Sequence, residues 1–133
     1  MIDVSKYIGV KFAEKGRGPR FDCWGLVMEI LDREYSITGL PDFKDRYVHT
    51  GDYVGIGSCI DQEKINWKEV DAPKEGAVIV FNVKGRPHHV GICTGYQQGQ
   101  AWFFHVYEGT TAKHERLKST MWANRINSIY VYE

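Results

Sequence analysis

The sequence predicts an α+β domain in which an N-terminal helix carrying a cysteine packs on a small antiparallel β-sheet. An apolar run of helical length follows Asp22, and several short apolar runs with strand character follow residue 77. The length and composition are consistent with such a domain, because a chain of 133 residues, 43% of them hydrophobic, can bury a core without disulfide bonds. We therefore expect one domain over residues 1–133.

The helix-forming segments lie near the N-terminus. Residues 3–9 are expected to form a short helix capped by Asp3. Residues 13–20 are rich in Gly and Pro and are expected to form a loop. A longer helix then runs from about Asp22 to Tyr35. The Asp22 carboxylate can accept hydrogen bonds from the first-turn amides, and the residues after it are apolar nearly all round, as in a buried helix.

The second half of the chain changes to strand character. Residues 36–75 show no clear period, and we expect irregular structure there with one short helix near residues 61–67. From residue 77 onward the apolar runs are short, rich in β-branched and aromatic residues, and separated by turns. Strands are expected at residues 77–83, 88–94, 101–107 and 128–132.

Two of these strands carry histidines that a hairpin would bring together. On residues 88–94, His89 shares a face with Gly91 and Cys93. A three-residue loop at residues 97–99 would pair Gly91 with His105. His89 and His105 would then be diagonal neighbours on one face, about 7–8 Å apart at the backbone. Two imidazoles can meet across that gap.

Cys23 stands where a helix can activate a thiol. A helix N-terminus carries partial positive charge, which favours the thiolate and lowers the pKa of the cysteine. An imidazole in reach completes the activation, and a second polar group holds that imidazole in one tautomer. Cys23, His89 and His105 fit nucleophile, general base and orienting residue. The first-turn amides, including that of Cys23, could face a developing oxyanion.

Two glycines fit the same arrangement. Gly25 costs about 1 kcal/mol relative to Ala in a helix interior, which suggests that another backbone packs close by. A close approach of helix and strand would account for both Gly25 and Gly91, since each lets the backbones come together.

Other interpretations of these residues remain open. Taken singly, Cys23 could be a core residue and each strand histidine a structural one. Cys93 shares the face of His89, but it stands in mid-strand without a helix terminus to acidify it. A zinc site built from cysteine and histidine also stays open, but no pair has the spacing typical of such a site, and no metal or other cofactor is predicted. Cys59, His49 and His114 lie in poorly patterned regions.

Composition excludes several classes of protein. The charges of seventeen basic and seventeen acidic residues cancel, so the chain lacks the excess positive charge that binds nucleic acid. No apolar run approaches the roughly 18 residues of a membrane span, and the N-terminus lacks the pattern of a signal peptide. Three cysteines without pair spacing suit a reduced protein that is cytoplasmic when made. Action outside the cell would need another means of export.

Three segments resemble the NlpC-type cell-wall cysteine peptidases, the NlpC and p-sixty superfamily. FDCWGLV resembles their DCSGLV signature, PHHVGICTG their HVGIYLG segment, and FFHVYEG their FIHA-like segment, in the same order. PKEGAVIVF is similar to their PGDLVFF lead-in strand. The resemblance covers roughly residues 4–109.

The resemblance implies a papain-like α+β core and hydrolysis through a thioester. By matching positions it implies that Cys23 is the nucleophile, His89 the base and His105 the third polar member. The remaining site residues, expected to support the site and its oxyanion, are Asp22, Trp24, Gly25 and Tyr107. The implied substrates are peptidoglycan stem peptides.

The Cys-Trp-Gly sequence is most similar to versions of the family from bacteriophage tails and prophages. That likeness implies a role in tail assembly or host-wall penetration, with other tail proteins as partners and a place in the virion. Neither nucleic acid nor membrane is expected as a partner.

The chain departs from the family at two positions. Phe12 takes the place of a tyrosine whose hydroxyl faces the site in many relatives, with Tyr7 or Tyr107 as candidate substitutes. Ala77 replaces the acidic residue of the lead-in strand. Two further functions stay open: a catalytically vestigial structural tail component, and an amidase or acyltransferase that uses the same Cys-His dyad.

Overall fold

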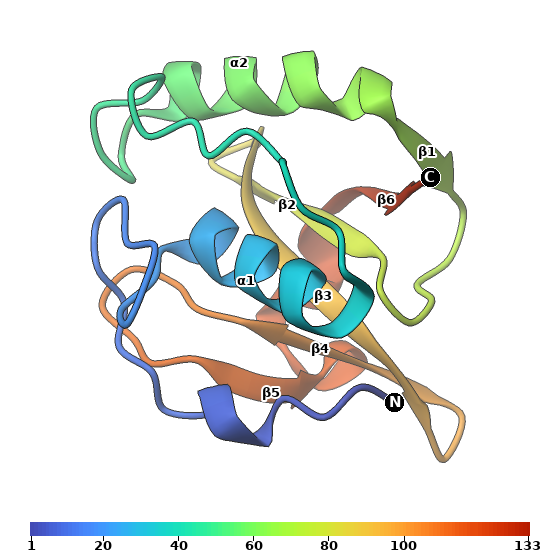
Figure 1. Ribbon diagram of the computed structural model, residues 1–133. Helices are drawn as coiled ribbons and strands as arrows, with labels where there is room; N and C mark the ends of the chain where they lie inside the picture. Colours follow the sequence, from blue (N-terminus) through green and yellow to red (C-terminus); the bar gives the residue numbers. More distant parts are fainter.

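A computed structural model describes all 133 residues as two α-helices and one six-stranded antiparallel sheet (Figure 1). The helices are α1 (Cys23–Tyr35) and α2 (Tyr53–Glu63). The strands are β1 (Trp67–Val70), β2 (Val78–Val83), β3 (Arg86–Gln97), β4 (Gln100–His105), β5 (Lys113–Arg116) and β6 (Ile126–Tyr132). They lie in the order β1-β6-β2-β3-β4-β5. The predicted α+β class is confirmed.

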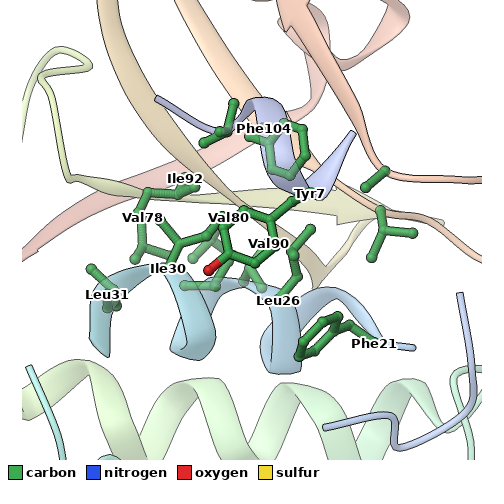
Figure 2. Packing of buried hydrophobic residues seen from close by; sticks show 14 of the residues in the cluster. Tyr7, Phe21, Leu26, Ile30, Leu31, Val78, Val80, Val90, Ile92 and Phe104 are labelled. Atoms are coloured by element: carbon green, nitrogen blue, oxygen red, sulfur yellow. The ribbon is translucent and has the colours of Figure 1, made fainter. Parts of the chain in front are cut away.

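Helix α1 packs on one face of the sheet through its apolar side. It begins at Cys23, where the Asp22 side chain accepts a hydrogen bond of 2.8 Å from the amide of Gly25. Leu26 and Ile30 point at the strands, as Figure 2 shows, and both are almost fully buried. Burying an aliphatic side chain of this size contributes about 1.5–3 kcal/mol. This face therefore holds the start of α1 firmly against the sheet.

The opposite face of the sheet carries a second core. Strands β2 and β3 alternate their side chains, so Val80 and Val90 face α1 while Phe81 and Cys93 face the second cluster. Trp122 covers that cluster from a 3₁₀ turn (Met121–Arg125). Both faces are covered, which explains why residues 77–81 form one continuous apolar run.

The hairpin between β3 and β4 differs from the predicted one. Its loop is two residues long, Gln98 and Gly99, both with positive φ, and Gln97 pairs with Gln100. This loop alone would move the two strands out of the predicted register by one residue. A bulge between Cys93 and Gly95 makes up the difference, so the strands recover the predicted alignment beyond it.

The two glycines make close approaches, but not to each other. A Cβ on Gly25 would lie 2.1 Å from the carbonyl oxygen of Gly16, in the loop before α1. A Cβ on Gly91 would lie 3.2 Å from the Phe104 carbonyl oxygen and 3.2 Å from the His105 Cβ. Helix α1 does pack on β3, but the predicted reason for the two glycines is wrong: Gly25 lets the loop before α1 approach the helix, and Gly91 lets β4 approach β3.

Several elements lie outside the predicted ranges. The first helix is only a 3₁₀ turn (Ser5–Tyr7), and the helix expected near residues 61–67 is α2, which starts at Tyr53. Helix α2 contains two glycines, so its local helix propensity is poor and packing stabilises it. Strand β1 lies within residues 36–75, where no strand was expected. Strand β5 was not expected either, because its sequence is polar, as is common for a strand at the edge of a sheet. Neither helix has the length and apolar character to cross a membrane.

Candidate active site

Cys23 lies at the start of α1, beside strand β3. The backbone amide of Val90, the residue after His89, hydrogen-bonds with the Cys23 sulfur, as does the amide of Trp24. Cys23 and His89 both line one cavity, which the first turn of α1, helix α2 and the sheet enclose. The fold thus brings residues 23 and 89 to the same site.

His89 and His105 are joined by a direct contact between their rings. The Nε2 of His89 lies 2.9 Å from the Nδ1 of His105, and both side chains are buried. The other nitrogen of His105, Nε2, lies 2.6 Å from a carboxylate oxygen of Glu115 on β5. The Nδ1 of His89 is buried and has no hydrogen-bond partner. The three side chains form one polar chain that ends in an unpartnered imidazole nitrogen.

Aromatic rings fix the orientation of His89. The ring of Trp122 lies 4.5 Å from it, and those of Tyr107 and Phe81 lie 5.0 Å and 5.6 Å from it, measured between centroids. Phe103 stacks on His105 at 4.3 Å. Such packing leaves each imidazole few alternative rotamers. Tyr107, one of the expected supporting residues, therefore packs against the ring of His89.

The pKa of the Cys23 thiol is raised to about 12, opposite to the predicted direction. Burial removes water from the sulfur and is the largest cause, and the Asp22 carboxylate adds repulsion. The amides of Val90 and Trp24 favour the thiolate but do not outweigh these two effects. The expectation that the helix N-terminus lowers the pKa of Cys23 is therefore wrong, because burial of the sulfur, and after it the Asp22 carboxylate at the same helix start, outweigh the helix amides.

The two imidazoles are also held in their neutral forms. Burial lowers the pKa of His89 well below its usual value, with further lowering from the neighbouring histidines. Burial likewise lowers the pKa of His105, against the opposing effect of Glu115. At neutral pH the site therefore holds a thiol and a neutral imidazole. A neutral imidazole with a free nitrogen can accept a proton, as a general base must.

Asp22 belongs to a buried polar network that the sequence did not indicate. Its carboxylate forms an ion pair of 2.7 Å with Arg17 and accepts a hydrogen bond from the Tyr47 hydroxyl. Arg17 also donates to the Asp42 carbonyl oxygen at 2.5 Å. Asp22 thus ties the glycine-rich loop and residues 36–75 to the start of α1. No local pattern connects Arg17 and Tyr47 with Asp22, because their contact depends on tertiary folding.

The first turn of α1 retains one amide for an oxyanion. The Gly25 amide is occupied by Asp22, and the Trp24 amide hydrogen-bonds with the sulfur. The Cys23 amide donates no hydrogen bond. Gly25, one of the expected supporting residues, therefore has no free amide for an oxyanion. Trp24, another of them, donates a hydrogen bond of 2.9 Å from its indole nitrogen to the Pro41 carbonyl oxygen.

The two tyrosines named as substitutes for the missing hydroxyl occupy different places. Tyr7 is buried in the core cluster under α1 and does not line the cavity, whereas Tyr107 does. Phe12 lines the cavity as well. Tyr47 supplies another hydroxyl to the cavity wall, but it is bound to Asp22. Tyr107 is thus the substitute that the fold favours.

The cavity beside Cys23 has predominantly apolar walls. Residues 36–75 supply much of one side, through the loop before α2, helix α2, the 3₁₀ turn after it and β1. The apolar side chains that form the walls include Trp24, Phe43, Ile56, Ile60, Trp67 and Val80. A ligand in this cavity meets rings and aliphatic groups with a few polar groups beside the thiol.

The other two cysteines, as well as His49 and His114, lie apart from the polar chain. Cys93 is fully buried in the second core cluster, which removes it as a rival nucleophile. Cys59 is buried and borders the cavity from α2. His114 contacts the Thr94 hydroxyl at 2.8 Å, and His49 accepts from the amide of Gly51. No group of three or more potential ligands is arranged to hold a metal ion.

Comparisons with known proteins bear on the family and on the fold of the chain. A family model described as "NlpC/P60 family" matches residues 9–131. A solved structure from Staphylococcus aureus subsp. aureus Mu50, described as similar to lipoprotein, NLP/P60 family, superposes with a TM-score of 0.61 at 22% identity. The alignment covers 95% of this chain and 37% of that one, and at this identity it shows the fold. A search of curated proteins found no match.

Proposed function

The chain belongs to the NlpC/P60 family, and we therefore propose that it is a cysteine endopeptidase that hydrolyses peptidoglycan stem peptides. Members of this family are generally cell-wall hydrolases, peptidases or amidases. In the proposal, residues 1–133 act as one catalytic domain with Cys23 as nucleophile, His89 as base and His105 as the orienting residue. The observation that supports it best is the buried contact of His105 with His89, which lines the same cavity as Cys23.

The proposed reaction starts from a neutral thiol. The Cys23 sulfur attacks the peptide carbonyl carbon while its proton passes to Nδ1 of His89. The amide of Cys23 donates to the oxyanion of the tetrahedral intermediate. The protonated His89 then gives its proton to the leaving amine, and a thioester remains on Cys23. Water, deprotonated by His89, attacks the thioester, releases the carboxylic acid and restores the thiol.

Digestion of purified muropeptides followed by mass spectrometry tests the proposal. The wild-type protein should release stem-peptide fragments, and Cys23→Ala should release none, because the variant lacks the sulfur that attacks the carbonyl carbon. Cys93→Ala is the matched control, since that residue is buried in the second core cluster away from the cavity. Cleavage that persists in Cys23→Ala, or is lost equally in both variants, would count against the assignment.

The finer proposal is that this enzyme serves a bacteriophage or prophage tail, in tail assembly or host-wall penetration. It rests on the resemblance of the Cys23-Trp24-Gly25 sequence to tail-associated versions of the family. The protein would be made in the cytoplasm and carried in the virion beside other tail proteins. Mass spectrometry of particles released by the strain that encodes the chain tests this. Particles purified to constant composition that lack the chain would refute it.

An amidase or acyltransferase is the second candidate, and the apolar cavity favours it. The same thiol and imidazole can form a thioester with any acyl group that fits, and rings and aliphatic side chains suit an apolar acyl group. Hydrolysis of a stem peptide yields a free carboxylic acid. Transfer yields a new ester or amide, so product masses after incubation with amine or alcohol acceptors separate the two reactions.

A vestigial structural tail component is the third candidate, motivated by Phe12 and by the raised pKa of Cys23. In an active site His89 assists the reaction of Cys23 with iodoacetamide at neutral pH. His89→Gln should then slow the labelling by about tenfold or more. Equal labelling of wild type and His89→Gln would favour the structural role.

A further inference from the structure

Glu115 completes the polar chain from the far side of His105. It stands on the edge strand β5, where it pairs with Phe103, and its side chain turns to the same face as His105. A carboxylate oxygen of Glu115 lies 2.6 Å from Nε2 of His105. The His105 side chain is 6% exposed and the Glu115 side chain 33% exposed, so the contact forms where the buried chain reaches solvent. The proposed reaction assigns Glu115 no role.

The order of donors and acceptors along this chain follows from the carboxylate. An ionised carboxylate only accepts hydrogen bonds, so Nε2 of His105 must carry the proton of that bond. A neutral imidazole has one N–H, and Nδ1 of His105 is therefore an acceptor. Nε2 of His89 lies 2.9 Å from it and must donate. Neutral His89 then has a bare Nδ1, which is the buried nitrogen without a partner.

We propose that Glu115 is a positioning residue that sets the tautomers of both imidazoles and so leaves Nδ1 of His89 free to take the proton of Cys23. The proposal rests on the proposed function, since it assigns Glu115 a purpose in the chemistry of Cys23. Glu115 acts through His105 and touches neither the thiol nor the substrate.

The opposite tautomer would disable the base. If Nδ1 of His105 carried the proton, it would donate to Nε2 of His89, and His89 would then hold its own proton on Nδ1. That nitrogen could accept nothing from Cys23. Without Glu115, water can either donate to or accept from Nε2 of His105, and both tautomers become accessible.

The neighbours of His105 keep it neutral, as the argument requires. The charged or titratable groups that face it are Glu115 and Lys113 on β5 and His89 on β3. Lys113 pairs with His105 in the ladder and opposes a second positive charge. Phe103 and Trp122 shield the ring from water on its other sides. A neutral ring has one proton to place, and the carboxylate decides where it goes.

Nitrogen-15 NMR of the histidine rings tests the proposal without any substrate. Long-range proton–nitrogen correlation distinguishes the two neutral tautomers of each histidine. In the wild-type protein at neutral pH, both His89 and His105 should carry their proton on Nε2. A wild-type spectrum with the proton on Nδ1 of either ring overturns the proposal, and this measurement needs no variant to fold.

Three variants extend the test to reactivity. Glu115→Ala should show a mixture of tautomers at His105 and His89, and its Cys23 should react with iodoacetamide at least about tenfold more slowly at neutral pH. Glu115→Gln can present either its carbonyl oxygen or its amide N–H to Nε2 of His105, so it should also show a mixture of tautomers and slower labelling, because only the carboxylate is a pure acceptor. Glu69→Ala removes a carboxylate from the other edge strand, β1, and should match wild type.

The outcomes separate this proposal from the proposed function. Unchanged tautomers and labelling in folded Glu115→Ala would overturn the role of Glu115 while leaving peptidoglycan cleavage standing. Conversely, altered tautomers and slower labelling in that variant support the role even where wild-type protein cleaves no muropeptide. A purely structural role for Glu115 would change the stability without moving the ring protons.

Discussion

The Nε2 of His89 lies 2.9 Å from the Nδ1 of His105, although the two-residue loop between their strands would by itself put the two rings on opposite faces of the sheet. The two-residue loop shifts the strands by one position, and the bulge between Cys93 and Gly95 shifts them back. Side chains alternate along a strand, so without this compensation the two rings would lie on opposite faces of the sheet. The site therefore depends on a bulge located several residues away.

The ionisation of Cys23 is the first quantity to measure. Its pKa is raised to about 12, so the folded protein should show no Cys23 thiolate absorbance between about pH 7 and pH 9. The difference spectrum between wild type and Cys23→Ala isolates this residue from Cys59 and Cys93. In urea the thiolate should appear with a pKa of about 8.5. A thiolate signal in the folded protein at pH 7 would show instead a preformed ion pair with His89.

The Asp22 carboxylate should stabilise the fold and, at the same time, raise the pKa of the Cys23 thiol. Asp22→Asn keeps a side-chain oxygen for the Gly25 amide but leaves Arg17 without its anionic partner. We expect the free energy of unfolding to fall by about 3 kcal/mol, because Arg17 is largely buried. The pKa of Cys23 should fall at the same time, since the Asp22 charge helps to raise it. Urea denaturation and thiolate absorbance check the two effects.

A control for this variant lies on the same helix. Asp32 is exposed, so Asp32→Asn should change the free energy of unfolding by less than about 0.5 kcal/mol. It should also leave the thiolate absorbance of Cys23 unchanged. A Cys23 pKa that stays constant in Asp22→Asn would contradict the role given to the Asp22 charge.

Two glycine variants should have opposite effects on stability. The Cβ of Gly25→Ala would lie 2.1 Å from the Gly16 carbonyl oxygen, so the backbone must shift, at a cost of about 2–3 kcal/mol. The Cβ of Gly57→Ala, in α2, would meet only the Pro87 carbonyl oxygen at 3.8 Å, which is ordinary contact. That variant should gain about 1 kcal/mol of helix propensity. Thermal and urea unfolding of both variants check the signs, and equal effects would contradict the close approach.

Acid should destabilise the protein through its buried histidines. Burial lowers the pKa of His88, His89 and His105 in the folded state, so the unfolded state binds more protons as the pH falls. The contribution of the neutral histidines to the free energy of unfolding is therefore complete above about pH 6.5, and the free energy of unfolding decreases as the pH falls below that value. Each histidine contributes about 1.4 kcal/mol for every pH unit by which its folded pKa lies below its unfolded pKa. Urea denaturation between about pH 5 and pH 8 measures the slope.

A single variant assigns part of that slope. His88 stacks on Tyr53 at 4.3 Å between ring centroids, and its Nδ1 is buried without a partner. His88→Phe keeps a ring in that place and removes the group that takes up a proton. Its stability should decrease less than that of wild type between pH 7 and pH 5. A slope equal to that of wild type would show that His88 is not part of the acid response.

The sequence alone determined the start of α1, the apolar strands and the candidate nucleophile. These features depend on local physics. An aspartate caps the helix at the residue before Cys23, and an unbroken apolar run from residue 77 suits a strand with both faces covered. The order of Cys23, His89 and His105 along the chain also indicated the family, since order and spacing are properties of the sequence itself.

Tertiary structure decided the rest, because the remaining features join residues that are distant in sequence. Glu115 reaches His105 from a polar edge strand that no hydrophobic pattern marks, and Arg17 and Tyr47 reach Asp22 from a loop and an irregular segment. The pKa of Cys23 shows the reason most clearly. The helix start is local and favours the thiolate, but burial and the Asp22 charge favour the thiol, and burial arises only when the whole chain has folded.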